Sequence, residues 1–298
     1  MNWTELPDDV KRHYPWPGSY LTTSAGHRLH YLDEGKGEVL LMIHGNPTWS
    51  FYYRTLVAGL SDRYRCVVPD HVGAGLSDKP QDWTYRLEDH VRNVVELIDH
   101  LNLQNVTLVV HDWGGPIGFG AAVQRSDRIA RLVVFNTSVF MEHVPLSIRL
   151  SRWPGFGELA IQGFNGFVRG AMFRGLGDPS RMKDGVGRGY RAPYRSWSER
   201  LGHLKFIRDI PLEDGHPTRA VVEALTTEVP AKFADRPALI LWGEQDFVFT
   251  GTFLEKWKTM LPKAEVVTYP DAAHWVVEDA HERIVPRMKA FMEAHPIV

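Results

Sequence analysis

Short apolar runs alternate with longer amphipathic stretches along most of the chain. The apolar runs that predict buried strands are RLHYLDEG, VLLMIHG, YRCVVPD, residues 106–111, ARLVVFNT, ALILWG and AEVVTYP. Helical periodicity is clearest in residues 85–103, and further helices are predicted at 114–125, 217–228, 252–261 and from Glu278. This alternation is typical of a parallel sheet that is covered by helices on both faces.

The alternation stops at Ser138 and resumes after about residue 215. The intervening segment is rich in aromatic residues, arginine and glycine, and no buried parallel strand can be placed in it. A disordered linker would fit poorly with so many Trp, Phe and Tyr side chains. We therefore expect a main α/β domain made of residues 1–137 and 216–298, interrupted by a helical cap at 138–215.

The amino-acid composition and charge narrow the classes of molecule that the protein is expected to bind. The 298 residues are 44% hydrophobic and 23% charged, and 34 Lys and Arg face 36 Asp and Glu. Because no basic stripe is visible, we expect neither nucleic acid nor an anionic membrane surface as a partner. The single cysteine, Cys66, lies in an apolar run and predicts a buried thiol.

The apolar runs of the sequence are short. The N-terminus lacks the apolar stretch of a signal peptide, and no apolar run approaches the ~18 residues of a membrane span. We expect a cytoplasmic protein without stable membrane insertion.

The segment VVHDWGGPIGF places Asp112 between an apolar run and a glycine-flanked helical stretch. A strand–turn–helix with small residues at the turn is typical of a nucleophile elbow. Gly114 and Gly115 allow the helix to approach the strand closely, although Val110 stands where the pattern usually has glycine. An aspartate that merely caps the following helix gives a similar pattern, so the elbow alone leaves both interpretations open.

Two later residues favour the catalytic interpretation. Asp246 ends the run ALILWGEQD, and His274 follows the last predicted strand. In this topology the order nucleophile, acid, histidine is the one expected, with all three at the carboxyl edge of the sheet. A carboxylate is ionised at neutral pH and attacks without a base. His274 could then activate water to hydrolyse the resulting ester.

A departing anion needs hydrogen-bond donors, and two neighbours offer them. Trp113 adjoins Asp112 and carries an indole N–H, and Asn46 follows another predicted strand. Their backbone N–H groups would form the oxyanion hole. A core aromatic and a turn residue remain the alternative interpretation of these two positions.

The motifs HGNPTWSFYYR, PDHVGAGLSDKP, HDWGGPIGF, WGEQDFVF and DAAHWVVED resemble those of haloalkane dehalogenases of the α/β-hydrolase superfamily, over nearly the whole chain. The resemblance implies an eight-stranded, mostly parallel sheet with an inserted helical cap. It assigns the nucleophile to Asp112, the base to His274, and the halide-binding pair to Asn46 and Trp113. One subfamily places its acid where this chain has Asn136, so the acid falls on Asp246.

The cap motifs are similar to those of the third dehalogenase subfamily, which itself resembles the β-lactone decarboxylases of bacterial olefin synthesis. The main interpretation is therefore a haloalkane dehalogenase-like hydrolase. The alternative is a cis-β-lactone (3-alkyl-4-alkyloxetan-2-one) decarboxylase that yields a long-chain alkene. A third is an epoxide hydrolase, in which Tyr190 and Tyr194 would protonate the opening epoxide.

No metal-binding spacing and no complete nucleotide-binding loop is present in the sequence. We expect no cofactor and no metal. The expected partners are a small apolar halogenated or lactone substrate and a halide ion. A homo-oligomer of the chain is also compatible with the sequence.

Overall fold

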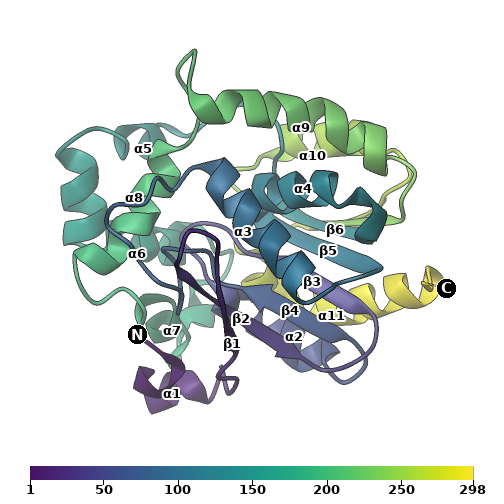
Figure 1. Cartoon of the computed structure of the whole chain (residues 1–298), viewed down its shortest axis with the longest axis horizontal. Helices are drawn as coiled ribbons and strands as arrows, with labels where there is room; N and C mark the ends of the chain where they lie inside the picture. The colour runs from purple at the N-terminus through teal and green to yellow at the C-terminus, as the bar shows by residue number, and fades with distance from the viewer. Residues whose placement is uncertain (298) are drawn as a thin grey trace.

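One sheet of eight strands runs through residues 1–297, the part of the chain that the computed structural model describes (Figure 1). The strand order is β1-β2-β4-β3-β5-β6-β7-β8. The strands are β1 (Ser19–Thr22), β2 (Arg28–Glu34), β3 (Val39–Ile43), β4 (Arg65–Pro69), β5 (Val106–Asp112), β6 (Ile129–Thr137), β7 (Ala238–Gly243) and β8 (Glu265–Tyr269). The pairs β1–β2 and β2–β4 are antiparallel, and the remaining pairs are parallel.

Both faces of this sheet are covered, as the continuous apolar strands require. Along β3, Leu40 and Met42 enter one core, and Leu41 and Ile43 enter the other. Helices α2 (Arg54–Leu60) and α11 (Val276–Ala294) cover the first face. Helices α3 (Leu87–His100), α4 (Gly114–Gln124), α9 (Pro217–Phe233) and α10 (Gly251–Met260) cover the second.

The predicted α/β fold with an eight-stranded, mostly parallel sheet is confirmed. Strand β1 was not predicted, because its four residues lie at the sheet edge and are only partly covered. Helix α9 also continues past its predicted end at residue 228. It contains Pro230, and the burial of Val229 and Phe233 stabilises its last turns.

We call residues 138–215 the cap segment. Within it the chain forms helices α5 (Leu146–Leu150), α6 (Gly166–Arg174), α7 (Val186–Arg191) and α8 (Leu201–Arg208), with shorter helical turns between them and no strand. Figure 1 shows these helices at the end of the molecule opposite the C-terminal end of α11. The short helix α1 (Asp8–Lys11) contacts α7. Within residues 1–297, no helix has the length and apolar character needed to cross a bilayer.

Candidate active site

Asp112 sits at a sharp turn between β5 and α4. Its φ is 51°, a left-handed conformation that non-glycine residues rarely adopt. Neighbouring glycines make room for the turn. A Cβ on Gly45 would lie 2.1 Å from Asp112 Oδ1, and a Cβ on Gly114 would lie 1.9 Å from the Ile43 carbonyl oxygen. Thr137 Oγ1 donates to the Asp112 carbonyl, which fixes the turn from β6. The carboxylate is thereby held above the carboxyl edge of the sheet.

His274 and Asp246 meet Asp112 at this edge. His274 Nδ1 lies 2.9 Å from Asp246 Oδ2, and its Nε2 lies 3.7 Å from Asp112 Oδ2. Asp246 Oδ1 in turn accepts backbone N–H groups from Val248 at 2.6 Å and Phe249 at 3.1 Å. The histidine thus has one nitrogen held by an anchored carboxylate and the other turned toward Asp112.

Burial and charge act in opposite directions on this cluster. Burial raises the pKa of Asp112, against the opposing effects of His274 and of the backbone N–H groups of Trp113 and Asn46. Burial alone would lower the pKa of His274, but the charge and hydrogen bond of Asp246, together with Asp112, raise it above its ordinary value. The charge of a protonated His274 therefore opposes the effect of burial on Asp112 and favours its carboxylate form.

Asn46 follows β3 and contacts both Asp112 and the cap segment. Its backbone N–H donates to Asp112 Oδ1 at 2.6 Å. Its side-chain amide is held at both ends by His203 of α8, whose Nδ1–H donates to Asn46 Oδ1 at 2.8 Å and whose carbonyl accepts from Asn46 Nδ2 at 3.2 Å. Burial, with Lys79 nearby, lowers the pKa of His203 to about 3, so its ring is neutral. One cap residue therefore sets the orientation of the Asn46 amide.

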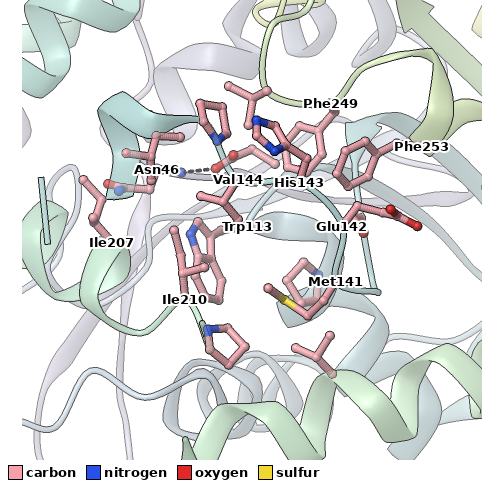
Figure 2. Close-up of a pocket in the computed structure, with 18 of the residues that line it drawn as sticks. Asn46, Trp113, Met141, Glu142, His143, Val144, Ile207, Ile210, Phe249 and Phe253 are labelled. Atoms are coloured by element: carbon pink, nitrogen blue, oxygen red, sulfur yellow. Dashed lines mark hydrogen bonds between the residues drawn. The ribbon is translucent and has the colours of Figure 1, made fainter. Parts of the chain in front are cut away.

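Trp113 lines an apolar cavity of about 120 Å³ above Asp112, which we call the Trp113 pocket. Figure 2 shows its ring among the lining side chains, with Asn46 and Ile207 on one side and Met141, Phe249 and Phe253 on the other. Its walls combine α4 and the start of α10 with residues 138–148 and α8 of the cap segment. The indole thus borders a largely apolar space next to the carboxylate.

A second cavity, of about 390 Å³, also reaches Asp112 and is called here the Phe156 pocket. Phe156, Ala160, Gly170 and Arg174 line it, together with His274. Both pockets share the same junction, lined by Asn46, Asp112, Ile148, Phe167 and Val248. The space above the carboxylate is therefore forked into two apolar branches.

The two tyrosines that an epoxide hydrolase would use lie elsewhere. Tyr190 donates to the buried Glu278, and Tyr194 accepts the Gly75 N–H at 2.9 Å. Neither lines the Trp113 pocket or the Phe156 pocket. The hydroxyl groups are engaged outside the site, which disfavours epoxide opening with their help. Across residues 1–297, no three His, Cys, Asp or Glu side chains gather as a metal site would require.

All five predicted site residues come together at the junction of the pockets or beside it. His203 was missed. Its side chain lies next to Asn46 although 157 positions separate them in the chain, and no spacing in the cap segment signals that contact.

Comparison with known proteins identifies the relatives of this chain. The family described as alpha/beta hydrolase fold matches residues 38–280. Two proteins named cis-3-alkyl-4-alkyloxetan-2-one decarboxylase, from Shewanella oneidensis and Xanthomonas campestris, are each 43% identical. The alignments cover 90% and 95% of this chain and 86% and 98% of theirs.

Dehalogenases are also similar. Haloalkane dehalogenase 2 of Mycobacterium bovis is 35% identical over 91% of this chain and 93% of its own. The crystal structure of the haloalkane dehalogenase DatA from Agrobacterium tumefaciens superposes with a TM-score of 0.83. It is 27% identical and covers 94% of this chain and 97% of its own. The chain belongs to the alpha/beta hydrolase fold and, within it, to the haloalkane dehalogenase family, in the group that also contains the oxetanone decarboxylases.

Proposed function

We propose that the protein decarboxylates cis-3-alkyl-4-alkyloxetan-2-ones to alkenes, with Asp112 as the nucleophile. The observation that carries the proposal is the fork above Asp112, because such a lactone has two alkyl chains on neighbouring ring carbons. The decarboxylases at 43% identity support it above the dehalogenases at 35%. This ranking reverses the order of the two interpretations drawn from the sequence motifs.

The proposed decarboxylation has two steps, and both use only residues at the junction of the pockets. Asp112 Oδ attacks ring carbon 4, and the bond from that carbon to the ring oxygen breaks and releases a carboxylate. Asn46 and Trp113 stabilise this anion by hydrogen bonds. Next, the bond between carbon 3 and the carboxylate breaks, its electrons form the double bond, and Asp112 leaves as a carboxylate. The products are carbon dioxide and an alkene.

The stereochemistry follows from the direction of attack. Displacement from behind places the ester oxygen anti to the freed carboxylate, which is the alignment that fragmentation requires. The two alkyl chains then end on the same side, so a cis lactone gives a cis alkene. No water and no proton enter either step. A protonated His274, whose Nε2 lies 3.7 Å from Asp112 Oδ2, would stabilise the Asp112 carboxylate as it leaves.

Hydrolytic dehalogenation is the second candidate, favoured by the pairing of Asn46 with Trp113 and by the dehalogenase relatives. There Asp112 displaces halide to form an alkyl ester, and His274 activates water to hydrolyse the ester to an alcohol. The two reactions share their first intermediate type and differ in their need for water and for His274.

The experiment compares wild-type protein with His274→Ala on a long-chain cis-β-lactone and on a bromoalkane series. We expect wild-type protein to release alkene faster than bromide. The variant should still form alkene but should accumulate an Asp112 ester with bromoalkane, seen by mass spectrometry. Asp112→Ala, the control, should do neither. Faster bromide release, or a β-hydroxy acid in place of alkene, would contradict decarboxylation as the main function.

A further inference from the structure

The cap segment concentrates the exposed apolar surface of the molecule. Within residues 1–297, the large apolar side chains that are exposed all belong to it: Leu146, Trp153, Phe156, Leu159, Phe164, Phe173 and Trp197. We call this set the cap patch. Phe173 is 74% exposed and Trp153 is 63% exposed. Leu159 and Trp197 approach each other beside Gly163. Exposed large apolar side chains that are concentrated in one segment in this way favour a binding surface.

Positive charge accompanies this surface. The cap segment contains 12 Lys and Arg and 8 Asp and Glu, a net charge of +4 within a chain of net charge −2. Arg149 follows Leu146 in the sequence, and Arg169 lines a hollow with Phe164. Both arginines are exposed and have no carboxylate partner within residues 1–297. The charge balance of the whole chain, which argued against an anionic surface, conceals this division.

A basic hollow of about 450 Å³ adjoins the patch. Phe164 lines it together with Arg169, Arg191 and Arg200. Asn165 adds a buried side chain, 5% exposed, whose Oδ1 has no hydrogen-bond partner among the described residues. Guanidinium groups bind phosphate, and a free amide oxygen accepts a hydroxyl group. The guanidinium of Arg200 already donates to backbone carbonyls. Arg169 and Arg191 supply the remaining donors, and with the Asn165 oxygen they can receive a phosphate ester that bears hydroxyl groups.

From these features we propose that the cap patch docks on the surface of an anionic phospholipid bilayer. Aromatic side chains enter the interface while arginines pair with headgroups, which is the way peripheral proteins bind without crossing the membrane. A second copy of the chain suits the patch less well, because facing patches would bring like charges together. Docking also places the Phe156 pocket at the bilayer, since Phe156 and Arg174 are exposed and line that pocket. An apolar substrate then passes from lipid to Asp112 without crossing water.

The test is flotation of the purified full chain with vesicles of phosphatidylcholine alone or of an equal mixture with phosphatidylglycerol. We expect binding to the mixed vesicles only, and its loss at high salt. Arg149→Glu with Arg169→Glu should weaken binding more than tenfold, since each basic residue near an anionic surface contributes about a fivefold factor. Trp153→Ser with Phe173→Ser should weaken it by a similar factor. The matched control, Lys36→Glu with Lys232→Glu, changes the same charge on exposed residues outside the cap segment and should bind normally.

Three results would overturn the proposal: the protein fails to float with the mixed vesicles, floats equally well with vesicles of phosphatidylcholine alone, or floats with vesicles only when another protein is added. Light scattering in which the patch variants lose self-association while vesicle binding persists would assign the patch to a second copy instead. Turnover of a short, water-soluble bromoalkane or lactone checks that the variants are folded. Since vesicle binding is measured without catalysis, its outcome is independent of which reaction Asp112 performs.

Discussion

The main domain and the cap segment bury their apolar side chains in different ways. In the main domain, strands such as β3 and β5 are covered on both faces, and Asn46 and Asp112 lie at their carboxyl ends. In the cap segment, short helices leave seven large apolar side chains exposed and still line both pockets. The sheet thus holds the proposed catalytic groups, and the cap segment lines the pockets above them. Five predictions test how complete this division is.

The largest effect should come from the end of β5. Asp112→Ala removes the nucleophile and should lower turnover by ~10⁴-fold or more with any substrate. Mass spectrometry should detect no covalent adduct, whereas wild-type protein shows one on Asp112 during turnover. An adduct on another residue would move the reacting group away from the elbow.

Trp113→Phe keeps a ring in the pocket and deletes only the indole N–H. We expect the first bond-breaking step to slow by about 10²-fold, the usual effect of one lost donor to a developing anion. Rapid-quench measurement of adduct formation isolates that step. An unchanged rate would reduce Trp113 to a packing residue.

Lowering the pH should slow the formation of the covalent adduct on Asp112. Burial raises the pKa of Asp112, so the protonated, unreactive form persists to higher pH than for an ordinary aspartate. Adduct formation should fall about tenfold per pH unit below that pKa, with the acid limb above the ordinary value of about 3.9. In His274→Ala the limb should move higher still, because the opposing charge is gone. A limb at or below the ordinary value would contradict the assignment.

His203 tests whether the cap segment also contributes to the chemistry. His203→Ala removes the bond to Asn46 Oδ1, leaves the bond to the backbone carbonyl, and should slow adduct formation by about tenfold, less than the loss of a donor itself. His203→Asn places an amide N–H near the original Nδ1 and should restore most of the rate. A wild-type rate in His203→Ala would mean that Asn46 needs no support from the His203 side chain.

The smallest effect should appear in chain-length selectivity. Gly170 lies in α6, lines the Phe156 pocket, and has open space around its Cβ position. Gly170→Leu should lower kcat/KM a few-fold for long-chain substrates only, and should raise the free energy of unfolding by about 0.5–1 kcal/mol through helix propensity. Gly251→Leu, also in open space but outside both pockets, should leave selectivity unchanged. A uniform loss across chain lengths would contradict a role in substrate length.

The same contrast explains what could be predicted from the sequence. Buried strands such as VLLMI can be predicted because their residues are continuously apolar. Asp112, Asp246 and His274 can then be found because each follows such a run. Strand β1 carries no such run, because an edge strand of four partly covered residues needs no continuous apolar sequence. In the cap segment, contacts such as that of His203 with Asn46 depend on tertiary packing across the pocket, and no local period reports them.

The two hydrogen bonds between Asn46 and His203 couple the orientation of the Asn46 amide to the position of the cap segment. Asn46, the proposed leaving-group donor, is held by hydrogen bonds from α8, while Asp112, the proposed nucleophile, is held by β5 and β6. A movement of α8 away from the sheet would break the bonds to Asn46 as it widened the Trp113 pocket, because Ile207 of α8 lines that pocket. Under the proposed function, a widened pocket would therefore leave Asp112 without an oriented amide to receive the leaving group.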